Sequence, residues 1–457
     1  MKPKIPVDLV CVDTTPKAYL AERAVLECTK QADFSSVKLL TNKSNLKHAV
    51  QIPEIRGLEG YSRFCIGEMA RHVQASHALV VQWDGYVLNT KSWTDEFLKY
   101  DYIGAPFQPS DTVGNGGFSL RSKKLLDYIS RANWKDPHPE DSAICIRHRA
   151  ELEALGFKFA PAELARKFSF EGRSWDGMEW SGVQNKWDGS FGFHSFLSVI
   201  PKKHAVQVFH HSGDSGDVIY GLATMKALGG GVMFFSCDNK YPYPMNSRWC
   251  RLHGSAEWVD NIAPLLEAQD YVWAAKYTHG TPFTTTHDLN KFRETWGTKT
   301  PSFDSLFQIH ATAFDLLLQE DEPWLTVPDP ISFPNFPIVV ARTPRYRNDK
   351  FPWGDLCAKY GDRMIFVGGE DEHLNFSGFL APRKVPHFRT KNMLHLAQVI
   401  AGAKVFIGNQ SAPLAIAHGL CKNCLVETWP LNANCCLKRD NAIYFNGDSV
   451  DIPKGWL

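Results

Sequence analysis

The feature that most constrains the fold is a repeated alternation of short, β-branched apolar runs with segments that carry apolar residues at helical spacing. In the first half of the chain this pattern is carried by VDLVCVD (7–13), AERAVLECTKQ (21–31), VKLLTN (37–42), YSRFCIGEMARHVQA (61–75) and HALVVQWDG (77–85). Such alternation predicts an α/β layered domain with a largely parallel sheet. Ligands of these sheets gather at the carboxyl ends of the strands, where Asp13 and Asp84 stand.

The same alternation returns in the second half of the chain. It is carried by AVQVFHHSGDSGDVIYGLATMKALGGG (205–231), VMFFSC (232–237), FPIVVARTP (336–344), DRMIFVGGEDE (362–372), NMLHLAQVIAGA (392–403), KVFIGN (404–409) and SAPLAIAHGL (411–420). A proline-rich segment, residues 321–337, separates the two groups and is interpreted as a hinge between two Rossmann-like lobes.

A length of 457 residues exceeds one ordinary hydrophobic core and calls for two or three units. The pattern predicts one α/β domain over residues 1–203 and a second over 204–457, with lobes at about 204–325 and 336–457.

Composition narrows the function classes. The chain is 44% hydrophobic and 22% charged, which is typical of a folded globular protein. Lys and Arg number 50 against 49 Asp and Glu, so a strongly basic body that binds nucleic acid by counterion release is excluded. The first 15 residues lack the apolar core of a signal peptide, and no run approaches the ~20 apolar residues of a membrane span, so the cytoplasm is the expected compartment.

Eleven cysteines are spaced irregularly, which favours reduced thiols over a disulfide framework. One group, Cys421, Cys424, Cys435 and Cys436, could hold a structural zinc ion. Because Cys435 and Cys436 are adjacent, the group lacks ordinary zinc-ligand spacing. Buried or surface thiols are therefore the favoured interpretation.

Asp84 ends a buried strand and precedes Gly85, which lets the chain turn away. A carboxylate in this position can hold a divalent cation against a diphosphate. It can also serve only as the cap of the next turn. The sequence around Asp84 alone does not decide between these two roles.

Three further stretches bear on that choice. GNGGFSLRS (114–122) is a glycine-rich loop before a strand, and its backbone N–H groups can approach a ligand, although an ordinary hairpin turn has the same composition. HPEDSAICIRHR (138–149) places Glu140 and Asp141 at a helix start, where acids suit the helix dipole and can also act as a general base. FGFHSF (191–196) sets His194 among glycine and aromatic residues, as a metal ligand or a packed histidine.

Taken in order, these stretches resemble a family of GT-A-like glycosyltransferase domains over about residues 5–200. The likeness is carried by VDLVCVDT, QWDG, YDYIGAPF, GNGGFSLRS, PEDS and FAPAELARKFSFEG. It implies that Asp84 is the metal-binding acid of a DxD-type motif that holds Mn²⁺ or Mg²⁺ against the donor diphosphate, with His194 completing the metal site. The position of the first acid is Gln82 here.

The same resemblance implies further roles. Asp13 and Thr14 would lie near the nucleotide, and Gly116 and Gly117 would line the donor site on its acceptor side. Asp141, or Glu140 beside it, would be the base of an inverting transfer. The chemistry is coherent, since a cation neutralises the charge on the leaving diphosphate while a carboxylate deprotonates the acceptor.

The second half resembles GT-B glycosyltransferases of the heptosyltransferase kind. The likeness is carried by HHSGDSGDVIYGL, FVGGEDE and AGAKVFIGNQSAPLAIAHGL. It implies a base at Asp217, contact of Arg342 with the diphosphate, and a donor cleft formed by Gly408, Asn409, Ser411 and Pro413. This chain departs from the family at Gln410, Ala412 and Ala415, where an acid, a glycine and a histidine are usual. Helix dipoles and basic side chains bind the diphosphate in such enzymes, so no metal is expected there.

The sequence therefore predicts a bifunctional glycosyltransferase whose domains add two sugars in turn to one acceptor. UDP-sugars are the expected donors of the first domain, and the acceptor hydroxyl could belong to a glycan, a lipid-linked saccharide, a protein or a modified nucleobase. Two alternatives stay open: a single GT-A enzyme with a non-catalytic nucleotide-sugar or glycan-binding module, and a sugar epimerase in the second half. Trp175, Trp180 and Trp187 are candidates for an acceptor-facing loop or for core packing.

Overall fold

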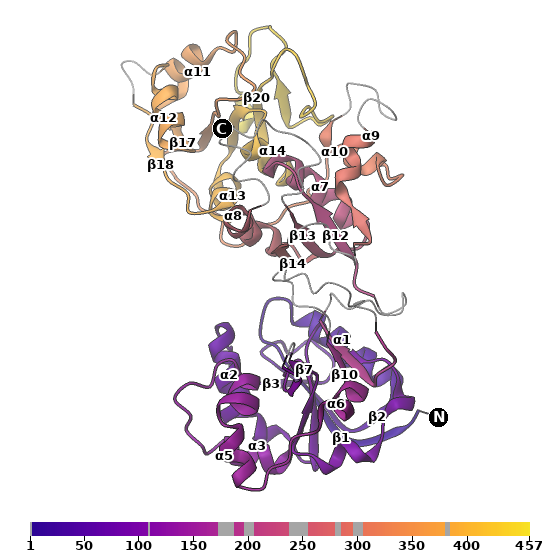
Figure 1. Cartoon of the computed structure of the whole chain (residues 1–457). Coiled ribbons are helices and arrows are strands. Elements are labelled where there is room, and N and C mark those ends of the chain that lie inside the picture. Colours follow the sequence, from indigo (N-terminus) through magenta and orange to yellow (C-terminus); the bar gives the residue numbers. More distant parts are fainter. Residues whose placement is uncertain are drawn as a thin grey trace. The chain divides into compact units, whose positions relative to one another are not determined.

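The computed structural model describes residues 2–107, 110–171, 187–195, 205–236, 255–278, 285–295, 305–379 and 384–457. The chain divides into two compact units, Met1–Ala205 and Val206–Leu457 (Figure 1). Each unit is an α/β body, which confirms the predicted fold class at this level. Trp175 and Trp180 lie outside the described residues.

The first unit is built on a six-stranded mixed sheet. Its strands, in spatial order, are β3 (Ala49–Gln51), β2 (Asp33–Thr41), β1 (Lys4–Val12), β4 (His77–Val81), β9 (Phe118–Ser122) and β6 (Tyr102–Gly104). β1 to β4 are mutually parallel, as the alternation predicts. β9 runs antiparallel to both neighbours, β4 and β6. The parallel half leaves the ends of β1 and β4 at one edge.

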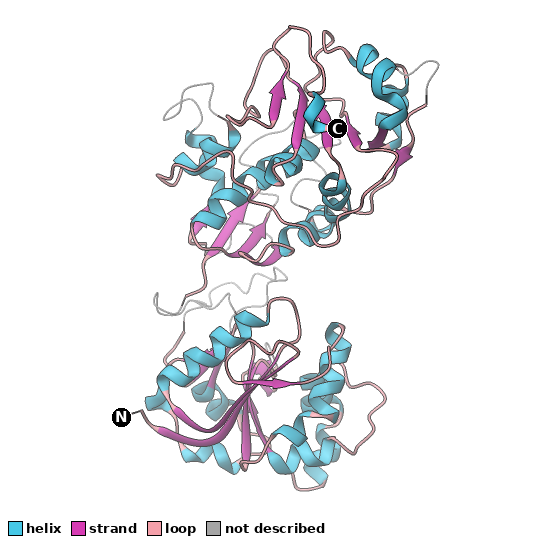
Figure 2. Cartoon of the chain, turned by 180° about the vertical axis from the view of Figure 1, so that it is seen from behind, coloured by secondary structure: helices cyan, strands magenta, loops and turns pink. Residues whose placement is uncertain are grey.

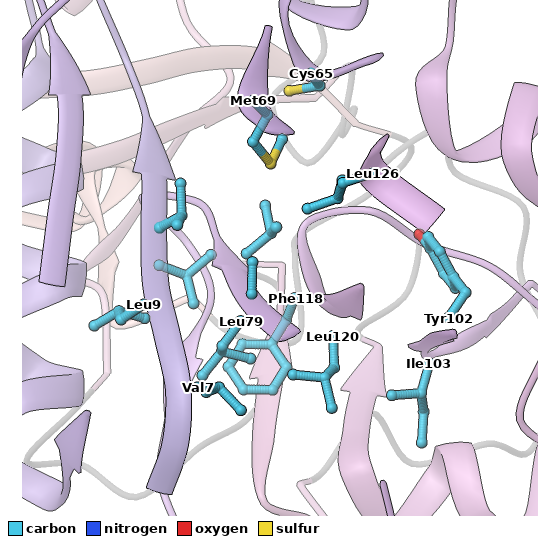
Figure 3. Close-up of a cluster of buried hydrophobic side chains, with 14 of the residues drawn as sticks. Val7, Leu9, Cys65, Met69, Leu79, Tyr102, Ile103, Phe118, Leu120 and Leu126 are labelled. Atoms are coloured by element: carbon cyan, nitrogen blue, oxygen red, sulfur yellow. The ribbon is translucent and has the colours of Figure 1, made fainter. Parts of the chain in front are cut away.

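One row of apolar side chains crosses this sheet. The register places Leu9 opposite Leu79, Leu79 opposite Leu120, and Leu120 opposite Ile103, so all four share one face. Figure 3 shows these residues in one cluster with Met69 and other side chains of the covering helices. The helices of this region are α2 (Gly57–Gly67), η1 (Met69–His72) and α3 (Lys123–Ile129). Burial of this row holds the sheet and the helices together.

Helices flank the sheet on both sides (Figure 2). α1 (Ala18–Gln31) buries Ala21, Ala24, Val25 and Cys28, an i, i+3, i+4, i+7 stripe that contacts β1 and β2. The helix predicted over residues 61–75 differs: α2 ends at Gly67 and a tighter 3₁₀ turn follows at Met69. The break therefore falls directly after Gly67, the last residue of α2.

A three-stranded sheet completes the first unit. It consists of β10 (Ser169–Glu171), β11 (Gly192–His194) and β5 (Tyr86–Val87). β10 and β11 are parallel and pair Glu171 with His194. The unit also contains η2 (Thr90–Ser92), η3 (Asp95–Lys99), β7 (Pro106–Phe107), β8 (Thr112–Val113), α4 (Glu140–Ser142), η4 (Ala143–Arg147), α5 (Arg149–Ala154) and α6 (Ala162–Phe168). Trp187 packs against the hydrophobic core of this unit and donates to Ser190 Oγ.

The second unit contains two parallel sheets. The first has the spatial order β14 (Val272–Tyr277), β13 (Gly231–Phe235), β12 (Val208–His211) and β15 (His287–Asp288). The second has the order β18 (His387–Phe388), β17 (Met364–Val367), β16 (Ile338–Ala341), β19 (Val405–Asn409), β20 (Asn423–Glu427) and β21 (Ala442–Tyr444). All their pairings are parallel. This matches the β and α alternation expected for the two lobes.

Helices connect and cover these strands. They are α7 (Ser215–Ala227), α8 (Ala256–Glu267), η5 (Leu289–Lys291), α9 (Phe292–Thr295), α10 (Leu306–Thr312), α11 (Trp353–Tyr360), η6 (Gly361–Arg363), α12 (Glu370–Ser377), α13 (Met393–Gly402), α14 (Ala412–Gly419) and η7 (Lys454–Trp456). α7 of the first lobe packs on α14 of the second. One hydrophobic core takes residues from both sheets, such as Met233 and Phe406. The two lobes are therefore one packed body.

The proline-rich segment predicted as a hinge has neither helix nor strand, and it is tied to its surroundings. The N–H groups of Trp324 and Leu325 both donate to the carbonyl of Gly419, and Trp324 Nε1 donates to the carbonyl of Ile219. The segment is thus bonded to helices of both lobes.

None of the helices in the described part of the chain is long and apolar enough to cross a bilayer. Cys424 and Cys435 are buried, and Cys421 and Cys436 are partly exposed. The thiols of Cys421 and Cys424 donate to the carbonyls of Asp321 and Lys422. The described ranges contain no group of three His, Cys, Asp or Glu residues that could hold a metal ion. The four cysteines named above therefore do not form such a group.

Candidate functional site

The candidate site of the first unit lies at one edge of its large sheet. The register aligns Cys11 of β1 with Val81 of β4, and Val81 with Phe118 of β9. Because β9 is antiparallel, its first residue meets the last residue of β4. The segments that follow β1 and β4, and the loop that precedes β9, therefore come together at this edge.

Asp84 is placed here by a tight turn after β4. The turn is closed by the N–H of Gly85, which donates to the carbonyl of Gln82 at 3.1 Å. A Cβ on Gly85 would lie 2.7 Å from the carbonyl oxygen of Phe193, so only glycine fits between β4 and β11. Asp84 is 7% exposed. Its Oδ1 is buried and has no hydrogen-bond partner among the residues that the structure describes.

His194 faces this carboxylate. Its Nε2 lies 3.4 Å from Oδ1 of Asp84 and 3.2 Å from Oε1 of Gln82. Its Nδ1 lies 3.0 and 3.2 Å from the two carboxylate oxygens of Glu171. The imidazole packs on Gly117, where a Cβ would come within 2.1 Å of Nε2. The ring is thus bound through both nitrogens.

Charge pairing dominates the electrostatics of this cluster. Burial acts to lower the pKa of His194, but the carboxylates of Glu171 and Asp84 raise that pKa well above its ordinary value. Burial raises the pKa of Glu171, and the charge of His194 opposes that shift. An imidazolium between two carboxylates is consistent with both directions. Nε2 carries a proton in this form, so it becomes a metal ligand only when a bound cation replaces that proton.

Gln82 occupies the position where a second acid is usual. Its Nε2 donates to the hydroxyl of Tyr61 at 3.0 Å, and this contact turns Oε1 toward His194. An amide oxygen is a neutral ligand that hard cations accept. Gln82 therefore directs an oxygen to the same point as Asp84, without the second negative charge.

The glycine-rich loop ties this cluster to the two acids of the PEDS stretch. The N–H of Gly116 donates to Oδ2 of Asp141 at 3.0 Å, and the N–H of Ser142 donates to Oδ1. One residue on, the N–H of Gly117 donates to Oδ1 of Asn115, which has φ +45°. Successive N–H groups of this loop thus orient Asp141 and Asn115.

Glu140 differs from its neighbour. It is buried, and its Oε1 pairs with the fully buried Arg121 at 3.2 Å. Ser62 donates to its other oxygen at 3.4 Å. A Cβ on Gly116 would lie 2.6 Å from Oε1 of Glu140. The two acids are therefore separated by environment: Glu140 neutralises a buried arginine, while Asp141 is half-buried and held by backbone N–H groups.

Asp13 and Thr14 follow β1 at the same edge. Oδ1 of Asp13 accepts from the N–H of Thr15 at 2.7 Å, and burial raises the pKa of Asp13. The hydroxyl of Thr14 exchanges hydrogen bonds with the backbone of Ile55, at 2.9 and 3.2 Å. Thr14 thus fixes the loop before α2, while Asp13 orders the turn after β1.

The donor set suits a hard divalent cation. Oδ1 of Asp84 and Oε1 of Gln82 both approach Nε2 of His194, at 3.4 and 3.2 Å, and Oδ1 of Asp84 is a buried acceptor that lacks a hydrogen bond within the described residues. Only two of these side chains are of the His, Cys, Asp or Glu type, and the described ranges contain no group of three such residues that could hold a metal ion. Mg²⁺ is commonly held by one or two carboxylates plus substrate phosphates, so a small protein set fits.

Two residues of this site escaped the sequence reasoning. Glu171 stands in the FSFEG stretch, where only its alternation with aromatic residues marks it as the end of a short strand. Arg121 reads as one residue of the strand-like GFSLRS run, yet it is fully buried behind Gly116. A charge inside an apolar strand pattern was the available signal in both cases.

In the second unit, two acids flank the start of α7: Asp217, the predicted base, and Asp214, which the sequence reasoning did not single out. Asp217 lies 3.4 Å from Arg293, and Asp214 lies 3.2 Å from Arg345 of the other lobe. The N-termini of α7 and α14 approach each other, since a Cβ on Gly216 would lie 3.9 Å from Cα of Ala412. Two positive helix ends and two arginines thus meet between the sheets.

The residues predicted along the donor cleft have defined roles here. Gly408 and Asn409 end β19, Ser411 is the N-cap of α14, and Pro413 stands in its first turn. The side chain of Asn409 binds the backbone of Thr343 in both directions, at 3.0 and 3.1 Å. Asn409 therefore holds the loop after β16 in place.

Arg342 does not stand free at this cleft. Its Nε and Nη2 form a bidentate ion pair with the buried Glu427, at 2.7 and 2.8 Å. Glu427 also accepts from Trp353 Nε1 and from the N–H of Asn348. Arg345, three residues on and partly exposed, reaches across to Asp214 instead. Arg345 is thus partly exposed after β16, whereas Arg342 is buried.

A Ser–His–Asp arrangement crosses the end of the first sheet of this unit. His210 Nε2 lies 2.7 Å from Ser236 Oγ, and His210 Nδ1 lies 3.4 Å from Asp288 Oδ1. Ser236 is 0% exposed, so its hydroxyl is closed to a substrate. We interpret this relay as a tie between β13, β12 and β15.

Residues 47–194 match the profile of a family described as a protein of unknown function, DUF5672. That range is less than half of the chain, and it contains Gln82, Asp84, Asp141, Glu171 and His194. No curated protein matches the chain.

Solved structures match over 52% of the chain with low scores. A glycosyl transferase family 9 protein from Veillonella parvula DSM 2008 is 10% identical, with a TM-score of 0.33 and 84% of its chain covered. The heptosyltransferase WaaC of E. coli, solved with ADP, is 11% identical, with a TM-score of 0.34 and 92% covered. Its structure with ADP-2-deoxy-2-fluoro heptose is 10% identical, with a TM-score of 0.33 and 92% covered. Scores this low carry no argument about activity.

Proposed function

We propose that the chain is a glycosyltransferase whose first unit transfers a sugar from a nucleotide-sugar donor to an acceptor hydroxyl. One observation carries the proposal: the buried Asp84 Oδ1 lacks a hydrogen bond within the described residues and lies 3.4 Å from His194 Nε2, which Gln82 Oε1 also approaches. The glycine-rich loop that supports His194 also holds a second carboxylate, Asp141. The resemblance of residues 5–200 to GT-A-like domains supports the same reading.

Asp84 and His194 would hold Mn²⁺ or Mg²⁺, with Gln82 as a neutral oxygen ligand. When bound, the cation supplies positive charge to the diphosphate leaving group. The protein residues position the donor and keep the site dry. Asp84 and His194 would orient the donor, and the surrounding apolar strands would exclude water from the site. Oδ1 of Asp84 forms no hydrogen bond within the described residues, and its ion pair with His194 Nε2 spans 3.4 Å. A bound cation would satisfy this buried oxygen.

Asp141 is the residue we propose as general base. It would take the proton from the acceptor hydroxyl as the oxygen attacks the anomeric carbon, and the nucleoside diphosphate would leave from the opposite face with inversion. The N–H groups of Gly116 and Ser142 fix the carboxylate of Asp141. Glu140 is the weaker candidate because Arg121 engages it.

The donor proposed for this unit is a UDP-sugar, with Asp13 and Thr14 near the nucleotide at the end of β1. The acceptor hydroxyl would belong to a glycan, a lipid-linked saccharide, a protein or a modified nucleobase. Stacking of a sugar on the aromatic rings of the unit would add affinity.

For the second unit we propose a metal-independent second transfer. Asp217 would act as the base, and the N-termini of α7 and α14 with Arg345 would take the diphosphate charge. The meeting of these helix ends within one packed core supports this proposal. Tethering both units in one chain would raise the effective concentration of the first product at the second site.

Nucleotide release from a panel of nucleotide sugars, with candidate acceptors and Mn²⁺, tests the proposal on the full chain. Asp84→Ala is expected to abolish the first transfer, and EDTA to stop that transfer while sparing the second. Asp217→Ala should remove only the second. Asp33→Ala and Asp260→Ala alter exposed acids of the two units and serve as matched controls.

Three outcomes would change the proposal. Equal activity with and without EDTA would remove the cation role from Asp84 and His194. If Asp217→Ala changes nothing while Asp84→Ala abolishes all release, the second unit is a binding module. If a nucleotide sugar is converted without acceptor in a manner that depends on Asp217, the second unit is an epimerase.

A further inference from the structure

The strand register of the small sheet places an acid behind the histidine of the site. β10 and β11 are parallel neighbours that pair Glu171 with His194, so the two side chains extend from the same face. Both carboxylate oxygens of Glu171 lie within hydrogen-bond distance of Nδ1, at 3.0 and 3.2 Å. Neither the sequence nor the proposed chemistry gave Glu171 a role.

Glu171 is not itself in position to bind the cation. Its two oxygens meet the imidazole at Nδ1, whereas Asp84 and Gln82 meet the ring at Nε2. The ring therefore separates Glu171 from the point where the other side chains meet. A carboxylate on one ring nitrogen fixes the direction in which the other nitrogen points.

Two further contacts restrict the pair. The imidazole lies against Gly117, which leaves no space for a Cβ. The side chain of Asn115 hydrogen-bonds to Glu171, and Asn115 Oδ1 also accepts from the N–H of Gly117. The loop that holds Asp141 through Gly116 thus also fixes Glu171. Glu171, His194 and Asp141 are therefore connected by one short loop.

We propose that Glu171 is a positioning residue, whose carboxylate holds the His194 imidazole with Nε2 turned toward Asp84 and the divalent cation. The cation part of this inference rests on the proposed function. The orientation of the ring does not, because it follows from contacts within the protein. A carboxylate behind a ligating imidazole typically changes metal affinity by about 10–100-fold.

Mn²⁺ binding to the full-length protein tests the inference, with free Mn²⁺ followed by electron paramagnetic resonance. Glu171→Gln is expected to raise the Kd for Mn²⁺ about 10–100-fold. Glu171→Asp keeps the carboxylate and should restore part of the affinity. Glu163→Gln makes the same change at an exposed acid of α6 in the same unit and should bind as the wild type does. A Kd for Glu171→Gln equal to that of the wild type would overturn the inference.

A second measurement is independent of the cation. In metal-free protein labelled with ¹⁵N-histidine, the Nδ1–H signal of His194, identified by its loss in His194→Ala, should exchange slowly because Glu171 accepts its proton. Glu171→Gln should broaden or shift that signal, and Glu163→Gln should not. An unchanged signal in Glu171→Gln would refute the positioning role even if the Kd changes.

The two measurements separate the proposals. If the wild type binds no Mn²⁺ but Glu171→Gln alters the Nδ1–H signal, the cation of the proposed function fails and the positioning role stands. Circular dichroism of each variant establishes that it is folded, and Glu171→Asp provides a second variant should Glu171→Gln unfold.

Discussion

Gly117→Ala is the substitution that most directly tests how the site of the first unit is packed. Gly117 lies against the face of the His194 ring, and an added Cβ would come within 2.1 Å of Nε2, 2.2 Å of Cδ2 and 2.5 Å of Cε1. Ordinary carbon contacts are about 3.5–4.0 Å, so the ring or the loop must move by more than 1 Å. Gly117 does not have positive φ, so the backbone itself accepts alanine.

The magnitude follows from what the ring would lose. His194 is held by Glu171 at 3.0 Å and faces Gln82 at 3.2 Å, so a displacement of this size breaks at least one charge-assisted hydrogen bond. Such a bond contributes about 1.5–3 kcal/mol, and overpacking costs typically 1–3 kcal/mol. Together these terms predict that Gly117→Ala lowers the free energy of unfolding of the first unit by about 2.5–6 kcal/mol. A misplacement of about 1 Å should also reduce sugar transfer about 100-fold.

A double-mutant cycle with His194→Ala is the assay. Urea unfolding of the four proteins gives the coupling free energy between the two positions. In the His194→Ala background the ring is gone, so Gly117→Ala should cost less than about 1 kcal/mol. Gly67→Ala is the control, because its Cβ meets nothing within 4 Å. An equal cost of Gly117→Ala in both backgrounds would refute the reasoning.

Three further predictions concern other parts of the chain. Burial lowers the pKa of His310 to about 3, while the unfolded chain takes up this proton near pH 6.5. Between these two pKa values the unfolded state therefore binds more protons than the folded state. The free energy of unfolding falls by about 1.4 kcal/mol for each pH unit below 6.5, and urea titrations of His310→Phe should show a smaller slope. Glu427→Gln leaves the buried Arg342 uncompensated and should cost about 3–5 kcal/mol in the unfolding of the second unit, whereas a cost under about 1 kcal/mol would contradict the role given to this pair. Gln82→Glu adds a second carboxylate beside Asp84 and should tighten Mn²⁺ binding in the same titration as above, and weaker binding would exclude Gln82 from the cation site.

Much of the architecture follows from the periodicity of the sequence. The strands around Leu79 and Val339 are unbroken β-branched or apolar runs because both faces of the sheet are covered. Helix ends were less predictable, as Gly67 shows by ending α2 within a continuous apolar pattern. Local patterns thus identify elements well, and their boundaries less well.

The candidate site was predictable only in part. Asp84 could be singled out because a charge at the end of a buried strand is conspicuous in the sequence. The role of Glu171 depends on the pairing of β10 with β11, which no local pattern encodes. Arg342 illustrates the converse. It follows a strand end, where a diphosphate ligand is expected, but it is bound by Glu427, which ends β20 and lies 85 residues away in the sequence.

The sequence by itself determined which segments form strands and helices, and which polar residues follow the strands, because both depend on short-range periodicity. The tertiary structure decided which of those residues meet. The register of β4, β9 and β11 brings Asp84, Gly117 and His194 to one edge, although they are distant in the chain. Strand pairing is a long-range choice set by the packing of whole elements, and the chemistry of the site depends on that choice.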